Sequence, residues 1–247
     1  MSLIEVSHLS KFFDSESGRV VALNDVSFNV DEGEFVGIVG KSGSGKTTLI
    51  NMLTGIDHPS EGSIVINGNH LEKMSENELS IWRGKNIGIV FQFFQLLPVM
   101  TVMENILLPM DYLNELPMNA RTDRANKILA ELALVPFADK YPHELSGGLQ
   151  QIAAIARALA NDPPILIADE PTGNLDSVTA SKVVDLFQSL VERDKTILMV
   201  THDQDMVQRT SRLLRISDGN LLQDETSPKA EASSFDKAQM NVEGGQT

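Results

Sequence analysis

The sequence predicts an α/β fold with a parallel sheet at its core, an antiparallel β element at its start and an inserted set of helices. Three observations carry this prediction. A short apolar run at 34–39 leads through a glycine-rich loop into a helical pattern at 47–53. Strands and helices alternate again after residue 148, whereas the segment from 101 to 141 shows only helical spacing.

The elements before residue 101 follow from pattern and composition. Residues 3–9 and 20–30 carry β-branched side chains in partial alternation and flank a polar stretch at 14–18, so we expect two antiparallel strands. The apolar run at 34–39 is the next strand, and the helix at 47–53 follows the glycine-rich loop. Further strands are expected at 64–66 and 87–91, with a helix at 76–82 between them.

The middle of the chain is expected to be helical. Ala125, Ile128, Leu129 and Leu132 recur with the spacing of one helix face, and prolines punctuate the segment. After it, helices are expected at 148–160 and 177–193, and buried strands at 164–168 and 196–200. We therefore expect one domain over residues 1–222, with a helical subdomain inserted at about 95–160.

The segment 223–247 has a different composition from the rest of the chain. It holds five acidic residues, two lysines and one aromatic residue, with little else that is apolar. Such a segment cannot bury enough apolar surface to offset the entropy lost on ordering. We expect a disordered acidic tail.

Composition and charge exclude several classes of protein. Twenty basic against 34 acidic residues give a net charge of −14, which argues against a broad grip on nucleic acid. The absence of cysteine excludes disulfides, thiolate metal sites and cysteine nucleophiles. No signal peptide is apparent, and the longest uncharged stretch, 86–103, contains Gln92, Gln95 and Pro98, so we expect no insertion into the membrane. A cytoplasmic protein that reaches a membrane only through a partner fits these observations.

The strongest chemical signal is the glycine-rich loop before the helix at 47–53. It fits G-x-x-x-x-G-K-[ST], which needs a strand before it and a helix after it, as predicted here. Its backbone N–H groups can surround an anion, its lysine can reach the β- and γ-phosphates, and its threonine can bind Mg²⁺. This predicts a nucleoside triphosphate site, against the alternative of a plain Gly/Ser-rich turn. The site residues are Gly40, Lys41, Ser42, Gly43, Ser44, Gly45, Lys46 and Thr47, followed by Thr48.

Two carboxylates follow the buried strand at 164–168. Asp169 ends the apolar run, so its carboxylate is expected at the edge of the sheet where α/β proteins bind their ligands, as a second Mg²⁺ ligand. Glu170 stands one residue further on and can accept a proton from water attacking the γ-phosphate. The alternative is a strand that simply ends in two solvated acidic residues. Because the chain also contains the phosphate-binding loop, we prefer the functional interpretation.

A family resemblance rests on two further segments. Residues 145–151 read Leu145-Ser146-Gly147-Gly148-Leu149-Gln150-Gln151, and the strand with its two carboxylates reads ILIADEPT over 165–172. Together with the phosphate-binding loop they resemble the ATP-binding cassette (ABC) ATPases over about residues 3–222. The resemblance implies a P-loop NTPase fold with a RecA-like parallel-sheet core, ATP and Mg²⁺ as ligands, and ATP hydrolysis.

The resemblance also implies roles for other residues. Phe13 resembles the aromatic residue that stacks on adenine, Gln92 the Q-loop glutamine that contacts Mg²⁺ and the γ-phosphate, and His202 the switch histidine. A lone histidine after a strand is usually structural, which remains our interpretation of the other four histidines. The D-loop corresponds to Asn174, Leu175 and Asp176. The catalytic set is then Glu170, His202 and Gln92, and the Mg²⁺ set is Thr47, Gln92 and Asp169.

The signature segment predicts a second copy of the chain. Ser146 and the glycines after it open a helix, and a helix N-terminus binds anions. In the family, the signature of one subunit closes over ATP held by the other, in a head-to-tail dimer. Because this chain has one complete set, a homodimer is expected, with the signature acting in trans through Leu145, Ser146, Gly147, Gly148 and Gln150.

The wording of the motifs narrows the branch. Residues 91–98 (FQFFQLLP) and 170–176 (EPTGNLD) resemble the macrolide-export and lipoprotein-release branch, and cell-division and antimicrobial-peptide-resistance transporters share much of this wording. In that branch the partner is a membrane permease. We expect it to dock between Phe93 and Met103, with Phe94, Leu96 and Leu97 as contacts, unless these side chains simply pack the insertion. The transported or extracted substrate is selected by the permease.

Other functions explain less of the sequence. A soluble ABC protein of DNA repair or of the ribosome usually has two cassettes or a long coiled coil, and the net charge of −14 disfavours it. A P-loop kinase or GTPase leaves the signature and His202 unexplained.

Three positions depart from the usual family pattern. Phe13 stands where tyrosine is common, which retains the stacking face. Leu149 replaces a polar residue and Ile152 an arginine on the signature helix. These two changes predict either weaker contacts across the dimer or a more apolar partner surface.

Overall fold

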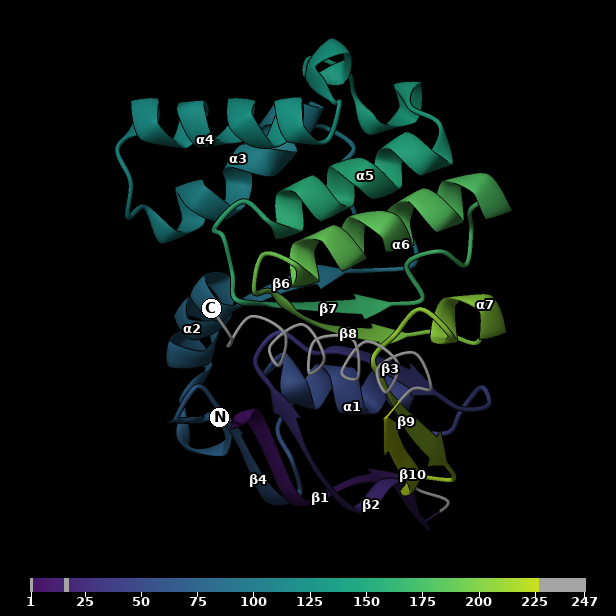
Figure 1. The fold of residues 1–247 in the computed structure, drawn as a ribbon. Coiled ribbons are helices and arrows are strands. Elements are labelled where there is room, and N and C mark those ends of the chain that lie inside the picture. Colours follow the sequence, from purple (N-terminus) through teal and green to yellow (C-terminus); the bar gives the residue numbers. More distant parts are fainter. Residues whose placement is uncertain (1, 16–17, 227–247) are drawn as a thin grey trace, which may run out of the picture.

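Two β-sheets and a set of helices make up the computed structural model, which describes residues 2–15 and 18–226 (Figure 1). The predicted α/β fold with a parallel core, an antiparallel β element and a helical insertion is confirmed. In Figure 1 the helical segments α3 and α4 lie at one end of the molecule and the antiparallel sheet at the other.

The antiparallel sheet has the strand order β2-β1-β4-β5. Its first two strands, β1 (Ser2–Ser15) and β2 (Gly18–Asp31), are longer than predicted. Their register shifts between Val6 and Leu9, which explains why the alternation in the sequence is only partial. The sheet is completed by β4 (Glu61–Ile66) and the short β5 (Asn69–His70).

The second sheet has the strand order β10-β9-β3-β8-β7-β6. Strands β6, β7, β8, β3 and β9 are parallel to their neighbours, and β10 closes one edge as an antiparallel strand. Every residue of β3 and β8 is buried, as expected for strands covered on both faces. The bounds are β3 (Phe35–Val39), β6 (Ile87–Val90), β7 (Ile165–Asp169), β8 (Thr196–Val200), β9 (Arg212–Ser217) and β10 (Asn220–Thr226).

The expected start of the tail at residue 223 is wrong by four residues. Strand β10 continues to Thr226, because the Arg212 guanidinium holds both carboxylate oxygens of Asp224 at 2.6 and 2.7 Å. The Arg215 side chain also donates to the Gln223 side chain at 2.6 Å. The remainder of the predicted tail, 227–247, lies outside the described residues.

Two of the helices begin at capping boxes that the sequence supplies. Ser75 with Glu78, and Thr101 with Glu104, form capping boxes at the starts of α2 and α3. The α-helices are α1 (Lys46–Leu53), α2 (Glu76–Asn86), α3 (Val102–Leu113), α4 (Met118–Glu131), α5 (Gly147–Ala158), α6 (Ser177–Val191) and α7 (Gln204–Val207). Short 3₁₀ turns lie at η1 (Leu71–Lys73), η2 (Val135–Phe137) and η3 (Pro142–Glu144).

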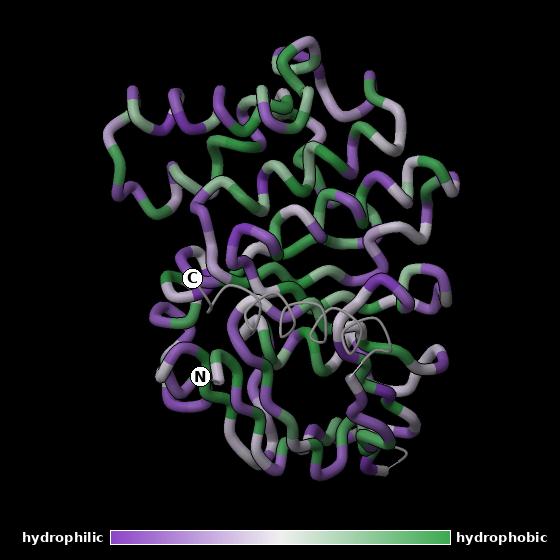
Figure 2. The backbone as a smooth tube through the Cα atoms, viewed as in Figure 1, coloured by the Kyte–Doolittle hydropathy of each residue, from purple (hydrophilic) through white to green (hydrophobic). Residues whose placement is uncertain are grey.

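Three hydrophobic clusters hold these layers together. Alternate residues of the six-stranded sheet face the antiparallel sheet and α1 on one side, and α5 and α6 on the other. A third cluster lies among α3, α4 and α5. Figure 2 shows the hydrophobic segments gathered between the layers. Within the described part of the chain, no helix is both long enough and apolar enough to span a bilayer.

Candidate active site

The site residues follow the carboxyl ends of three adjacent parallel strands. Ile38 of β3 and Asp169 of β7 both pair with Val200 of β8, so these strand ends share one edge of the sheet (Figure 1). The phosphate-binding loop follows β3, Glu170 follows β7 and His202 follows β8. Parallel α/β sheets bind their ligands at this edge.

The phosphate-binding loop is closed around its own lysine. Lys46 is buried, and its ammonium group donates to the carbonyl oxygens of Gly40 and Lys41 at 2.9 and 2.8 Å. Gly45 has φ +105°, and a Cβ atom there would lie 2.5 Å from the carbonyl oxygen of Ala22, so no larger residue fits. The hydroxyl of Ser44 is buried and has no hydrogen-bond partner among residues 2–15 and 18–226. An unpaired buried hydroxyl and an uncapped start of α1 fit an anion held by this loop.

A cavity of about 280 Å³ opens over this loop. The predicted residues Ser42, Gly43, Gly45, Lys46, Thr47, Thr48, Asp169 and Glu170 line it, together with Val20, Val21 and Ala22. Val20, Val21 and Ala22 were not predicted as site residues. The signal that could have indicated them is the predicted antiparallel pairing of β1 and β2, which places this segment beside Phe13.

Phe13 lies next to this cavity without lining it. Phe13 pairs with Val20 across β1 and β2, which puts the two residues side by side at the cavity margin. Its side chain is exposed, and the Lys11 ammonium lies 5.1 Å from the ring centroid. Lys11 is itself fixed by the Asp57 carboxylate at 2.8 Å.

Thr47 and Asp169 come together as the sequence predicts. The Thr47 hydroxyl donates to Asp169 Oδ2 at 3.3 Å. Burial raises the pKa of the Asp169 carboxyl, as does the nearby Glu170 charge, whereas the bond from Thr47 opposes the shift. Two hard oxygen donors, one of them a partly buried carboxylate, are a donor set that fits Mg²⁺.

Glu170 and His202 face each other. The Glu170 carboxylate lies 3.4 Å from His202 Nδ1, and the histidine is the more exposed of the two. Glu170 has φ +46°, and its N–H donates to the carbonyl oxygen of Val200 at 3.0 Å. A left-handed conformation costs energy at a residue other than glycine, asparagine or aspartate, and such strain is often retained at active sites.

Gln92 lies beside Glu170 because of a glycine between them. A Cβ atom on Gly173 would lie 3.0 Å from Gln92 Nε2 and 3.6 Å from Glu170 Oε2. The Asn174 amide also donates to the Gln92 carbonyl oxygen at 3.0 Å. Gly173 was not among the predicted site residues, because the sequence contains no signal for this close approach.

The signature and D-loop residues form the starts of two neighbouring helices. Ser146 caps α5, and Asp176 caps α6 by accepting from two backbone N–H groups and from the Thr179 hydroxyl at 2.6 Å. These hydrogen bonds, that of Thr179 foremost, lower the pKa of Asp176. A Cβ atom on Gly148 would lie 2.7 Å from Thr179 Cγ2, so the two helix starts are in close contact. Gln150 donates to the Leu145 carbonyl oxygen, and Gly147 follows the cap.

None of the signature residues lines the phosphate-binding cavity of its own chain in the described structure. Ser146 and Asp176 are exposed. The chain therefore keeps the two predicted phosphate-binding elements in separate places. Leu149 and Ile152, the departures from the usual pattern, pack against the cluster among α3, α4 and α5.

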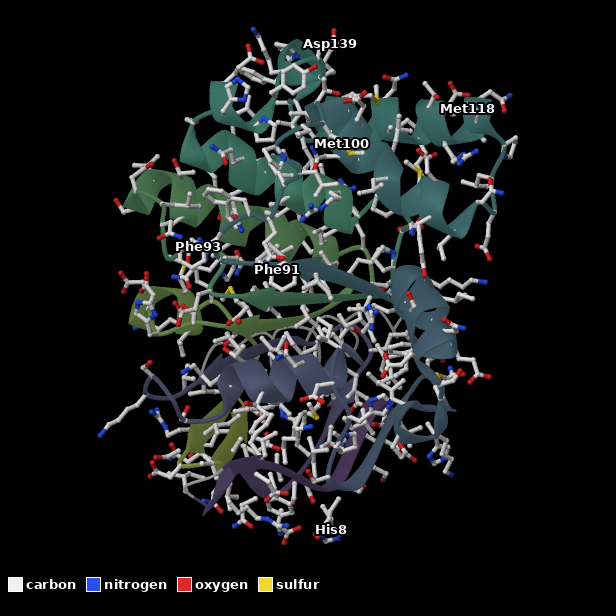
Figure 3. All side chains as sticks on the ribbon, turned by 180° about the vertical axis from the view of Figure 1, so that it is seen from behind. His8, Phe91, Phe93, Met100, Met118 and Asp139 are labelled. Carbon is white, nitrogen blue, oxygen red and sulfur yellow. The ribbon has the colours of Figure 1, made fainter. Side chains whose placement is uncertain are left out.

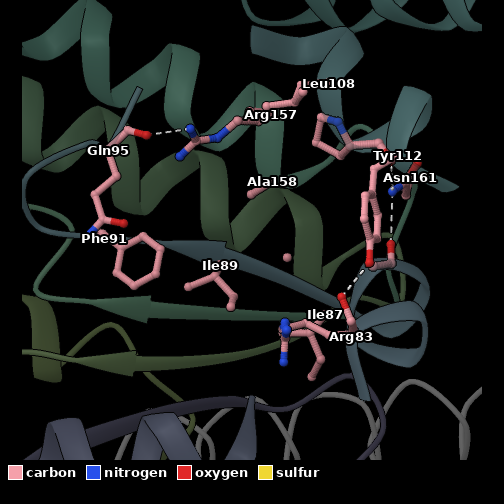
Figure 4. Close-up of a pocket in the computed structure, with 14 residues that line it drawn as sticks. Arg83, Ile87, Ile89, Phe91, Gln95, Leu108, Tyr112, Arg157, Ala158 and Asn161 are labelled. Atoms are coloured by element: carbon pink, nitrogen blue, oxygen red, sulfur yellow. Dashed lines mark hydrogen bonds between the residues drawn. The ribbon is translucent and has the colours of Figure 1, made fainter. Parts of the chain in front are cut away.

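A larger cavity of about 520 Å³ lies between the six-stranded sheet and the helical segments (Figure 4). The candidate docking residues Phe94, Leu96 and Leu97 do not line this cavity, and Leu97 is exposed outside it. Leu96 packs into the helical cluster, and Phe94 lies against Gly147, with its ring 3.7 Å from a Cβ position there. Phe91 and Gln95 line the cavity instead. Figure 3 shows Phe91 and the exposed Phe93 at the junction of the helical part and the sheet.

Both the sequence and the fold are similar to those of known proteins. A family profile described as "ABC transporter" matches residues 23–173. The lipoprotein-releasing system ATP-binding protein LolD of Aquifex aeolicus is 44% identical, over 81% of this chain and 89% of its own length. The bacitracin export ATP-binding protein BceA of Halalkalibacterium halodurans is 41% identical, over 90% and 87%. A dimeric post-hydrolysis ATP-binding cassette bound to ADP and Pi is 38% identical, with a TM-score of 0.84 over 90% of this chain and 98% of that chain.

Proposed function

This chain belongs to the ABC transporter family, and from that premise we propose that it is the ATP-hydrolysing subunit of an export-type transporter, active as a head-to-tail pair. One observation carries the proposal. The cavity over the phosphate-binding loop contains Lys46, Asp169 and Glu170 but no signature residue, whereas Ser146 lies exposed at the start of another helix. Each chain thus supplies the phosphate-binding loop of one ATP site and the signature segment of another.

ATP binding uses groups that the chain already holds in position. Lys46 exchanges its two carbonyl partners for the β- and γ-phosphates, and the free N–H groups at the start of α1 and the Ser44 hydroxyl donate to phosphate oxygens. Phe13 offers a flat apolar face to adenine at the cavity margin. These contacts make the cavity a site for a nucleoside triphosphate.

The Mg²⁺ that accompanies ATP would be held by the Thr47 hydroxyl and by Asp169, with Gln92 nearby. The ion would neutralise charge on the β- and γ-phosphates. The raised pKa of Asp169 agrees with a carboxylate placed to face a cation, because burial disfavours its charge when no cation is present.

Glu170 is the general base of the proposed hydrolysis. It accepts a proton from the water that attacks the γ-phosphate, and His202, 3.4 Å away, orients Glu170 and donates to a phosphate oxygen. Gln92 positions the water from the other side, where the absence of a side chain on Gly173 leaves it room. The left-handed backbone at Glu170 turns the carboxylate out of the line of β7.

The second copy completes the site. Ser146 and the N–H groups at the start of α5 point to the γ-phosphate held by the partner, and Asp176 contacts the partner through its D-loop. The relative bound to ADP and Pi is dimeric, which supports this arrangement. Closure of two chains on two ATP molecules, followed by hydrolysis, supplies the movement.

That movement is passed to a membrane permease, which holds the chain at the inner face of the membrane. The 520 Å³ cavity beside Phe91 and Gln95 is the proposed docking site. Permeases of the macrolide-export or lipoprotein-release type agree with the motif wording and with the LolD relative. An antimicrobial-peptide-resistance type is the second candidate, favoured by the almost equal identity to BceA.

The mass of the Glu170→Gln variant in solution tests the proposal. With hydrolysis blocked, sedimentation should show a dimer with ATP and Mg²⁺ and a monomer without nucleotide. The wild-type chain is the control, because it returns to the monomer as ATP is consumed. A monomer under both conditions would contradict nucleotide-driven pairing.

A further inference from the structure

The cavity between the sheet and the helical segments is positively charged in an otherwise acidic protein. Among the described residues its lining includes Arg83 and Arg157 and no aspartate or glutamate, although the chain has 34 acidic against 20 basic residues. The rest of the lining is largely apolar, with Ile87, Ile89 and Phe91 along the sheet (Figure 4).

In the described part of the chain, neither arginine has a carboxylate partner. Arg157 donates only to the carbonyl oxygens of Gln95 and Phe94, at 2.6 and 3.0 Å, and Arg83 only to those of Thr54 and Gly55. No carboxylate of residues 2–15 and 18–226 lies within 4.0 Å of either guanidinium, the distance that defines a salt bridge.

Most of the other arginines form salt bridges, although Arg124 and Arg215 have no carboxylate partner among the described residues. Arg121, Arg209 and Arg212 each have a carboxylate partner. Arg157 is largely removed from water, and burial lowers its pKa, which means that its charge is poorly compensated where it lies. A guanidinium has five N–H donors, and the two carbonyl bonds leave the others available.

We propose that the docked permease segment presents an apolar face carrying a carboxylate, and that this carboxylate pairs with Arg157. The inference rests on the proposed function and adds the chemistry of the partner. The apolar face of the segment covers Ile87, Ile89 and Phe91. Its carboxylate and Arg157 then form an ion pair shielded from water, which is stronger than a pair at the exposed edge of an interface. Arg83, in the same lining, accommodates a second acidic group.

The ion pair at Arg157 can affect the ATP site because Arg157 binds the backbone that follows Gln92. Phe94 and Gln95 both have positive φ, +57° and +49°, and Arg157 holds both of their carbonyl oxygens. These two residues follow Gln92 closely in sequence, and Phe94 packs on Gly147 at the start of the signature helix. A carboxylate on Arg157 thereby fixes the segment between Gln92 and the signature helix.

The experiment uses the chain in complex with its permease, reconstituted in lipid vesicles, and measures stimulation of ATP hydrolysis. Each cytoplasmic aspartate or glutamate of the permease is changed to its amide, against both the wild-type chain and Arg157→Gln. One permease carboxylate should lower stimulation about tenfold with the wild-type chain and have no further effect with Arg157→Gln. Permease variants leave this chain's folding untouched, and Arg83→Gln provides a second pairing. Arg124→Gln, outside the cavity, is the matched control and should give additive effects.

Two failures are distinguishable. If the permease stimulates the wild-type chain but no carboxylate shows non-additivity with Arg157 or Arg83, the charge pairing is wrong and the proposed function stands. If the permease fails to stimulate the wild-type chain at all, the proposed function is wrong and this inference is overturned with it.

Discussion

The phosphate-binding loop and the signature segment both present the N-terminus of a helix, yet they differ in what surrounds them. The loop before α1 lines a cavity with a buried lysine and with two carboxylates, Asp169 and Glu170, at the end of β7. Ser146, at the start of α5, is exposed and has only its own cap contacts. The N-terminus of α1 therefore lies in a formed cavity, whereas the N-terminus of α5 lies on an open surface. The difference indicates that the signature segment at the start of α5 is the part that needs a second chain.

Removing the lysine should have the largest effect on ATP binding. Lys46→Ala takes away a buried ammonium that contacts the phosphates, and a charged hydrogen bond of this kind is worth about 2–3 kcal/mol, or roughly a hundredfold in affinity. Titration calorimetry with ATP measures the loss. Lys41→Ala is the matched control, because the structure uses the carbonyl oxygen of Lys41 while its side chain is exposed. Equal affinity losses in both variants would argue against a special role for Lys46.

Blocking the open half should leave ATP binding intact and abolish hydrolysis. Ser146→Arg puts a long side chain at the exposed start of α5, where the proposed partner nucleotide binds. We expect ATP affinity of the isolated chain within about twofold of wild type and a rate of hydrolysis at least about a hundredfold lower. Calorimetry and a phosphate-release assay separate these two effects. A loss of ATP affinity would place Ser146 in the site of its own chain.

The contact between Gly173 and Gln92 should affect hydrolysis alone. Gly173→Ala adds a Cβ atom 3.0 Å from Gln92 Nε2, so the amide must move. We expect hydrolysis to fall about tenfold with ATP affinity unchanged, since misplacing one positioning group has an effect of this order. Asn174→Ala, which removes a hydrogen bond to the Gln92 backbone without crowding its side chain, should cause a smaller loss. Unchanged hydrolysis in Gly173→Ala would argue against the role of Gln92.

The smallest effect is on stability and depends on pH. Because the folded-state pKa of Asp169 is raised, its ionisation opposes folding, so this penalty is present at neutral pH and disappears as the pH falls through the raised value to the ordinary one. Asp169→Asn should therefore unfold at a slightly higher temperature than wild type at pH 7, with the difference shrinking in acid. Thermal unfolding at several pH values provides the measurement. A lower unfolding temperature at pH 7 would mean that the Asp169 charge is not penalised.

The sequence predicts the parts of the site that are contiguous in the chain. The loop at 40–47 and the pair Asp169–Glu170 each carry their chemistry in a short segment, with strand and helix context around them. Gly173 is different, because its importance comes from the approach of Gln92, which lies far away in sequence. No local pattern encodes that distance.

Strands β9 and β10 were not predicted from the sequence, again because contacts between separate segments determine them. Strands β9 and β10 are short and carry two arginines and two acidic residues, Asp224 and Glu225, and the cross-strand pairs that hold them are visible only after folding. The apolar residues at 94–97 were expected at a docking surface. Leu96 packs into the helical cluster whereas Leu97 is exposed, and hydrophobicity does not predict the left-handed backbone of Phe94 and Gln95 in this segment.

Mixing two inactive variants tests the split site most directly. Lys46→Ala lacks a working phosphate-binding loop but retains its signature, and Ser146→Arg has the opposite defect. If the signature acts in trans, a mixed pair contains one intact site, and the equimolar mixture should recover a substantial share of wild-type ATP hydrolysis although each variant alone is inactive. A mixture as inactive as its two components would contradict the account, because it would mean that each chain completes its own site.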